Sequence, residues 1–300
     1  MTKPIIVHIL PQNSTICGGI KVHYQLSSIE EELGYTSIIA FPDTKDIPTW
    51  FKNKQTVRSY DEAMQYISGR DSIVVGWEDP NPVRAFSSKR RVCYIQGEVF
   101  VSKTEPYDGI ELWYTSHWNE KTVGRSGYYV PPYIDPSVFY PGNKYKFTEF
   151  PYNIFVQARK AGYERWQQVM QYFPAPLRRR ISHMIQEDVL EEEFARFVRE
   201  ADIYFCHSYP EGFGLPALEA MASKTLVVGY TGGGGTDFME NMKNCIYTRD
   251  GDAEGIANAL LWVVTSAPGA IRELVDNGYE TAKSYSRFAT KRYLEQALGE

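Results

Sequence analysis

The chain has 300 residues, of which 43% are hydrophobic and 23% charged, so two globular domains with buried cores are expected and disorder is not. The formal net charge of -5 argues against capture of nucleic acid over the whole surface, although it is compatible with a local basic groove. The four cysteines are scattered, so neither a disulfide framework nor a cysteine zinc site is indicated. No apolar run reaches membrane-spanning length, so a transmembrane helix is not indicated either. A cytoplasmic protein is expected.

The first part of the chain is predicted to alternate strands with a helix. The opening apolar run is typical of a strand buried on both faces of a parallel sheet. The helix that follows is expected to present Ile20, Tyr24 and Leu33 on one inner side and to end at Gly34. This order is typical of the right-handed crossover of a doubly wound fold. The expected elements are strands at 4–10, 36–41, 71–77, 90–96 and 111–116 and a helix within 17–35.

A connector is predicted next, because residues 130–153 contain five prolines. We place a first domain at 1–145 and a second at 146–282, with a C-terminal helix in 283–300 that packs back on the first domain. The second domain repeats the alternation of strands and helices. Its expected elements are strands at 152–158, 202–208 and 225–231 and helices at 163–173, 188–201, 216–223, 236–242 and 254–264.

The stretch HSYPEGFGLPALEAMA, residues 207–222, places two glutamates around a glycine-rich bend. Pro216 suits the first turn of the helix, whose unpaired backbone N–H groups on Phe213, Gly214 and Leu215 predict an anion site. Glu211, before the bend, and Glu219, expected in the first turn, could accept hydrogen bonds from the hydroxyls of one ligand. The alternative for Glu219 is that it only complements the helix dipole.

A second glycine turn follows the next strand. Gly232, Gly233, Gly234 and Gly235 would let the backbone approach a ligand and leave N–H groups free, so a second phosphate cradle is expected there. Because the strands are neighbours in a parallel sheet, both turns should lie at the same edge of the sheet.

Residues 211–235 resemble the donor-binding signature of the retaining GT-B glycosyltransferases, the group that includes glycogen synthase and sucrose-phosphate synthase. Glu211 and Glu219 match the two glutamates of that signature, which are separated by seven residues. The resemblance implies an α/β fold of GT-B architecture, with two Rossmann-like doubly wound domains facing each other across a cleft and the second somewhat reduced. It also implies an enzyme that transfers a hexosyl or pentosyl group from a UDP-sugar, or alternatively a GDP-sugar, to an acceptor hydroxyl with retention and without a metal. Other segments that resemble the family, in order, are 17–35, 130–141, 157–170 and 246–264.

The same resemblance implies roles for individual residues. Glu219 would bind the ribose hydroxyls, and Glu211 would contact the donor sugar near the reacting carbon as an electrostatic and positioning group. Arg159 and Lys160 would neutralise the diphosphate, which gains charge as it departs. The backbone groups implied to contact the phosphates or the donor sugar belong to Phe213, Gly214, Leu215, Thr231, Gly232, Gly233, Gly234 and Gly235, with Gly18 and Gly19 across the cleft.

The acceptor side departs from the family pattern. Gln96 stands where family members commonly carry a histidine, and Glu98 and His117 are the other acceptor-side candidates. The acceptor implied is a glycan, a lipid-linked sugar or a small molecule, handled in the cytoplasm or at the periphery of the inner membrane. The alternatives are a modified base in DNA, which the net charge does not favour, and a nucleotide-sugar-binding module with weak catalysis.

Other charged and polar groups have simpler interpretations. Asp250 and Asp252 could hold a metal, but Asp252 is expected to cap the following helix. His207 beside Cys206 lacks a partner for catalysis and is expected to be structural or a ligand contact. The arginines 178–180 are interpreted as a solvated helix start, and the remaining histidines form no metal-binding spacing.

Overall fold

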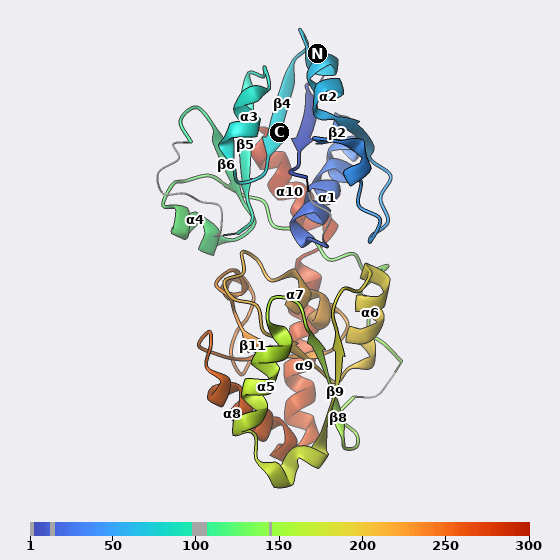
Figure 1. Ribbon diagram of the computed structural model, residues 1–300, viewed down its shortest axis with the longest axis vertical. Coiled ribbons are helices and arrows are strands. Elements are labelled where there is room, and N and C mark those ends of the chain that lie inside the picture. Colours follow the sequence, from blue (N-terminus) through green and yellow to red (C-terminus); the bar gives the residue numbers. More distant parts are fainter. Residues whose placement is uncertain (1–2, 13–15, 98–106, 144–145) are drawn as a thin grey trace. The chain divides into compact units, whose positions relative to one another are not determined.

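The computed structural model describes residues 3–12, 16–97, 107–143 and 146–300. These residues form two compact units, which we call unit 1, Met1–Tyr133 with Arg287–Glu300, and unit 2, Ile134–Ser286. Figure 1 shows helices packed around a sheet in each unit. Both units are therefore α/β, as the resemblance implies.

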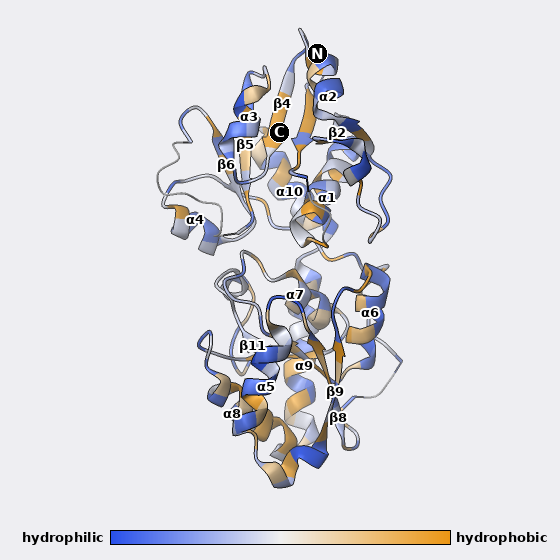
Figure 2. Cartoon of the chain, in the orientation of Figure 1, coloured by the Kyte–Doolittle hydropathy of each residue, from blue (hydrophilic) through white to orange (hydrophobic). Residues whose placement is uncertain are grey.

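Unit 1 is built on a seven-stranded parallel sheet in the order β3-β2-β1-β4-β5-β6-β7. The strand order reverses between β1 and β4, and the crevice beyond the carboxyl ends of such a pair is where ligands bind in open parallel sheets. Figure 2 shows that β4 is among the most apolar elements, which fits a strand buried on both faces. The strands are β1 Ile5–Ile9, β2 Thr36–Phe41, β3 Thr56–Ser59, β4 Ser72–Gly76, β5 Arg90–Ile95, β6 Glu111–Tyr114 and β7 Tyr128–Tyr129.

Helix α1, Gly18–Glu32, is buried on more than the single side that the sequence predicted. Lys21, His23, Gln25 and Glu30 are buried as well as Ile20. The reason is that α1 packs against β2 and also against α10, Arg287–Leu298, whose Arg287 pairs with Glu32 at 3.2 Å. The other helical elements of unit 1 are η1 Thr44–Asp46, α2 Tyr60–Ile67, α3 Pro80–Ala85 and α4 His117–Val123.

Unit 2 is built on a five-stranded parallel sheet in the order β12-β11-β10-β8-β9. Its core joins the strands to α5, α8 and α9 through one apolar cluster. The strands are β8 Tyr152–Gln157, β9 Ile181–Gln186, β10 Ile203–Cys206, β11 Leu226–Tyr230 and β12 Ile246–Thr248. The helical elements are α5 Gly162–Tyr172, η2 Ala175–Arg180, α6 Glu191–Glu200, α7 Leu215–Ala222, η3 Gly234–Asp237, α8 Ala253–Thr265 and α9 Pro268–Ser284.

Two local expectations for unit 2 are wrong, and one helix of the unit was not predicted. The arginines 178–180 end a 3-10 turn that leads into β9, and do not start a helix. The helix expected at 236–242 is replaced by η3, which already ends at Asp237. The longest helix of the unit, α9, was not predicted, although Ile271, Leu274 and Val275 show a helical spacing of buried residues.

Most of the proline-rich connector, from Ile134 onward, belongs to unit 2. The backbone N–H of Ile134 donates to the carbonyl of Tyr285 at 2.9 Å, and Arg199 on α6 donates to the carbonyl of Val138 at 2.7 Å. These bonds tie this part of the connector to unit 2, so the change of unit comes between Tyr133 and Ile134, earlier than the boundary between 145 and 146 that the sequence predicts. The chain returns to unit 1 at Arg287, where the sequence analysis placed the boundary between 282 and 283.

Candidate active site

The bend between β10 and α7 is the centre of the candidate site in unit 2. Gly214 is the N-cap of α7 and has φ 96°, in the left-handed region that favours glycine. No side chain caps this helix, although Pro216 occupies its first turn as predicted. The backbone N–H groups of Phe213, Gly214 and Leu215 have no hydrogen-bond acceptor within the described residues. These three donors, at the positive end of the helix, can receive an anion.

Lys160 and Glu211 lie together at this bend. The Lys160 Nζ is 2.7 Å from Glu211 Oε2, and the two side chains are 57% and 24% exposed. Lys160 and Ala161 both have left-handed backbones, with φ 51° and 61°, which are costly for residues other than glycine. This turn ends the segment after β8 and directs Lys160 toward the bend after β10, its neighbour in the sheet. Two of the predicted site residues are thus brought together.

Arg159 makes a different contact. Its Nε lies 3.5 Å from Asp188 Oδ1, and its side chain is 29% exposed. Its carbonyl accepts a hydrogen bond from Nε2 of His207 at 2.8 Å. A Cβ on Gly162 would lie 2.6 Å from the same His207 nitrogen, so the histidine and the glycine together fix this turn.

His207 and Cys206 do not have the properties of a catalytic pair. Burial lowers the pKa of His207, so the ring is neutral at pH 7 while it supports the Arg159 turn. Burial also raises the pKa of Cys206 well above its usual range, which keeps the group a thiol.

The second glycine turn is not a free phosphate cradle, and that expectation is wrong. The N–H groups of Gly234 and Gly235 donate to the carbonyls of Glu211 and Thr231 at 2.9 and 3.0 Å. Those of Gly232 and Gly233 are directed to Asp250 Oδ1 at 3.2 Å and Thr231 Oγ1 at 3.5 Å. All four amides are therefore engaged within the protein.

The glycines of this turn are required by contact with the first bend. A Cβ on Gly234 would lie 2.1 Å from the carbonyl oxygen of Gly212, and one on Gly232 would lie 2.6 Å from the Cβ of Glu211. The Glu211 N–H also donates to the Gly232 carbonyl at 2.7 Å. The two turns are locked backbone to backbone, and this contact fixes the position of Glu211.

Glu219 lies beyond the first turn of α7, which contains no acidic residue, so its expected position in that turn is wrong. Its side chain is 6% exposed. A carboxylate that is almost entirely buried is costly unless it is hydrogen-bonded. Burial to this degree is more than a surface charge complementing the helix dipole would need.

The acidic pair at 250–252 serves the fold. Asp252 caps α8 by accepting the Gly255 N–H at 2.8 Å, as predicted, and Asp250 accepts the Gly232 N–H. Among the described residues, no group of three or more His, Cys, Asp or Glu side chains could hold a metal ion.

Unit 1 contains the remaining candidates. A Cβ on Gly19 would lie 2.5 Å from the Trp77 ring and 2.8 Å from Gln96 Oε1, so the helix start touches the ends of two strands. Gly18 opens α1, and the side chain of its N-cap residue, Cys17, makes no capping hydrogen bond. His117 stacks on Tyr129, with ring centroids 4.2 Å apart. Glu98 lies outside the described residues.

Glu78 is a candidate that the sequence did not predict. It follows β4, is 2% exposed, and accepts the backbone N–H of Gln96 at 3.0 Å. Burial raises its pKa to about 7. Its place directly after a buried strand, at a carboxyl end, is the signal that could have found it.

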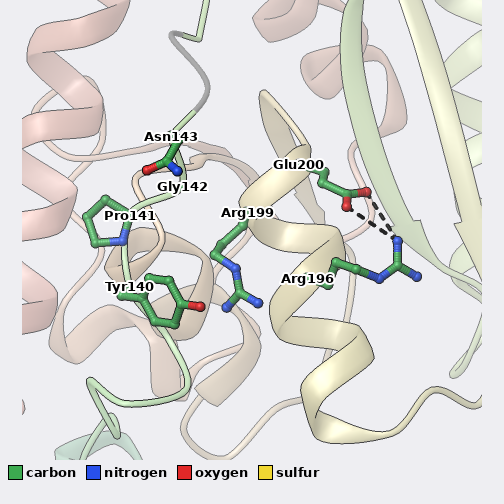
Figure 3. A pocket seen from close by; sticks show the side chains of 7 residues that line it. All are labelled: Tyr140, Pro141, Gly142, Asn143, Arg196, Arg199 and Glu200. Carbon is green, nitrogen blue, oxygen red and sulfur yellow. Dashed lines mark hydrogen bonds and ion pairs between the residues drawn. The ribbon is translucent and has the colours of Figure 1, made fainter.

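A separate hollow of about 340 Å³ lies between α6 and the connector (Figure 3). Arg196 pairs with Glu200 at 3.3 Å, and the Arg199 guanidinium lies 4.4 Å from the centre of the Tyr140 ring. The Arg199–Tyr140 contact joins the connector to the helix, and none of the predicted site residues that the structure describes lines the hollow. Its lining residues are Tyr140, Pro141, Gly142, Asn143, Arg196, Arg199 and Glu200.

Comparison with known proteins supports the resemblance. Residues 181–285 match the family described as Glycosyl transferases group 1. No curated protein sequence matches the chain significantly.

Solved structures match almost the full length of the chain. A glycosyltransferase from Rickettsia africae has a TM-score of 0.76 at 13% identity and covers 99% of this chain and 98% of its own. Sucrose-phosphate synthase from Thermosynechococcus elongatus has a TM-score of 0.73 at 16% identity, over 97% and 98%. HepE of Anabaena, in complex with UDP-glucose, has a TM-score of 0.75 at 11% identity, over 98% and 99%. The predicted GT-B fold of two Rossmann-like units, the second with the smaller sheet, is confirmed.

Proposed function

We propose that this chain is a glycosyltransferase that moves a sugar from a nucleotide-diphosphate sugar to an acceptor hydroxyl. Its residues 181–285 match the group 1 glycosyl transferases, and its two units have the GT-B fold. The observation that carries the proposal is in unit 2. There the Lys160–Glu211 ion pair lies at the same bend as the three available N–H groups that begin α7. A cation, an anion site and a hydroxyl acceptor in one place suit a sugar joined to a diphosphate.

The diphosphate would bind at the start of α7 and compete with Glu211 for Lys160. The pair is partly exposed, so solvent screens it and its partners can exchange. Once the diphosphate engages Lys160, the Glu211 carboxylate can accept hydrogen bonds from the donor sugar. Arg159, one residue before Lys160 and 3.5 Å from Asp188, would add a second positive charge.

Glu219 would bind the ribose hydroxyls of the nucleotide. It stands on the same helix whose first N–H groups would hold the phosphates, and a buried carboxylate can accept from two neighbouring hydroxyls. HepE is found with UDP-glucose, which favours a UDP-sugar as donor, with a GDP-sugar as the alternative.

The chemical step we propose retains the anomeric configuration. The bond from the anomeric carbon to the phosphate oxygen breaks with its electron pair on the phosphate, and the acceptor oxygen bonds to the same face of the carbon. The acceptor proton passes to a phosphate oxygen. Lys160, Arg159 and the α7 N–H groups stabilise the charge that grows on the diphosphate, so this route needs no metal. Glu211 positions the sugar and is not the nucleophile.

The acceptor is proposed to be a glycan, a lipid-linked sugar or a small molecule, bound on the side of unit 1. In the part of the chain that the structure describes, no helix has both the length and the apolar character to cross a membrane. A cytoplasmic location remains a prediction.

Thermal unfolding of the full chain with UDP-, GDP-, ADP- and TDP-sugars tests the donor proposal, because a ligand of the native state raises the melting temperature. We expect one base to raise it and the others to have no effect. Release of UDP from the stabilising donor then separates an enzyme from a binding module, which would show the shift without turnover. If no nucleotide sugar shifts the melting temperature, the proposal is wrong.

A further inference from the structure

Among the buried polar atoms of unit 1 that have no hydrogen-bond partner within the described residues, three belong to side chains of one cluster. They are Nε2 of His23, Oε2 of Glu78 and Nε2 of Gln96. Buried polar groups are nearly always paired, since an unpaired one loses its hydration without compensation. Three unpaired atoms gathered in one place therefore indicate a site for an external polar group.

The three side chains belong to one cluster. Trp77, which directly precedes Glu78 in the chain, stacks on His23, with ring centroids 5.9 Å apart and planes inclined by 22°. Gln96 donates its backbone N–H to Glu78, and Gly19 leaves less than a methyl group of room beside both Trp77 and Gln96. The cluster lies at the start of α1 and beyond the carboxyl ends of β4 and β5. This is the edge of the sheet where the strand order reverses.

The far side of His23 is already occupied. Its Nδ1 lies 2.9 Å from Nδ1 of His8, and Nε2 of His8 lies 2.9 Å from Glu30 Oε2. Burial, and then the neighbouring His8, lowers the pKa of His23, so its ring is neutral. Of its two ring nitrogens, Nε2 is the one that has no partner among the described residues.

The cluster is poorly suited to an anion. Burial raises the pKa of Glu78 to about 7, and among the described residues no basic side chain contributes to that pKa. At neutral pH the site is therefore uncharged or negative. A hydroxyl group fits it better, because it can donate to the Glu78 carboxylate and accept from the Gln96 amide at the same time. Gln96 is partly exposed, so the cluster can be reached from the surface.

We infer that His23, Glu78 and Gln96 form a subsite for an uncharged, hydroxyl-bearing group of the acceptor, and that this subsite disfavours a phosphorylated one. The inference rests on the proposed function, since it names the acceptor class of the same enzyme. Glu78 acts here as a specificity-determining residue of unit 1, whereas the donor groups belong to unit 2.

The test measures binding of paired probes to the full chain saturated with UDP, by saturation-transfer NMR followed by titration. The pairs are glucose and glucose 6-phosphate, mannose and mannose 6-phosphate, and myo-inositol and its 1-phosphate. We expect at least one neutral member to bind about tenfold or more tightly than its phosphate. In Glu78→Gln, which keeps the shape, the Kd of that neutral compound should rise about tenfold, as expected for one lost hydrogen bond to a charged group, while the Kd of UDP is unchanged.

Glu31→Gln is the matched control, because Glu31 is an exposed carboxylate of the same unit and should leave both constants unchanged. If Glu78→Gln fails to fold, as judged by circular dichroism, Gln96→Leu takes its place with the same expectation. The inference is overturned if no neutral probe binds, if the phosphates bind equally well, or if both substitutions leave the sugar Kd unchanged. Failure of the unsubstituted chain to bind UDP or any nucleotide sugar is a different result, which would overturn the proposed function and the inference with it.

Discussion

The contact between the two glycine turns of unit 2 predicts a large effect for Gly234→Ala. The new Cβ would lie 2.1 Å from the Gly212 carbonyl oxygen, and real Cβ atoms essentially never come closer than 3.0 Å. Neither neighbour is a flexible side chain, so the turns must move apart. That movement stretches the bonds from Gly234 to Glu211, 2.9 Å, and from Glu211 to Gly232, 2.7 Å.

The cost follows from these contacts. Two hydrogen bonds at about 1 kcal/mol each, with about 1–3 kcal/mol for overpacking, give a loss of about 3–5 kcal/mol in the free energy of unfolding. Glu211 moves with the turn, and a displacement of about 1 Å can reduce turnover about a hundredfold. Both effects come from a methyl group that touches no substrate.

Urea unfolding and donor turnover of the full chain check this prediction. Gly269→Ala is the matched control, because it makes the same chemical change in the first turn of α9, where a Cβ meets nothing within 4 Å. That change should be neutral or stabilising, by up to about 1 kcal/mol, since alanine favours a helix. If Gly234→Ala unfolds and turns over like the unsubstituted chain, the turns are not locked as described.

Three further predictions concern carboxylates. Glu211→Ala should lower turnover by about two orders of magnitude or more while UDP still binds, and near-normal turnover would contradict the proposed mechanism. Glu219→Ala should weaken UDP binding about tenfold or more in a calorimetric titration, and an unchanged Kd would refute a role with the ribose. The folded-state pKa of Glu78 is about 7, above the ordinary value of 4.5, so the folded state binds this proton more tightly than the unfolded state does. The stabilisation of the folded state by this proton is present at pH 4.5 and below, and it is lost as the pH rises to 7. Over that window the free energy of unfolding should fall by about 3 kcal/mol more in the natural chain than in Glu78→Gln, and equal slopes would contradict the pKa.

Much of the fold could be predicted because strands buried on both faces are nearly continuous apolar runs. Strand β9 was not predicted, because it lies at the edge of the described sheet, beside β8, and contains polar residues such as Ser182 and His183. Helix α9 was also not predicted. Its buried positions recur with helical spacing, but charged residues such as Arg272 and Glu273 interrupt the apolar pattern.

The site was predicted less completely, for a physical reason. A run of glycines indicates that another group lies close to the backbone, but it does not identify that group. The sequence therefore predicts a ligand beside Gly234, where the structure has the Gly212 carbonyl. The contact of Lys160 with Glu211 depends on the left-handed backbone conformations of Lys160 and Ala161, which cannot be predicted from these residue types. Glu78 gained its properties from burial, which only the packed unit defines.

The return of α10 to unit 1 also governs the order of events during synthesis. Unit 2 is one continuous segment, whereas unit 1 needs residues 287–298, which leave the ribosome after all of unit 2. Until then α1 lacks Arg287, which donates to the Ser28 carbonyl at 3.0 Å and pairs with Glu32. In the nascent chain, α1 of unit 1 therefore stays uncovered by α10 while unit 2 folds. A chaperone that holds apolar surface would meet this protein at its N-terminal half, although that half emerges first.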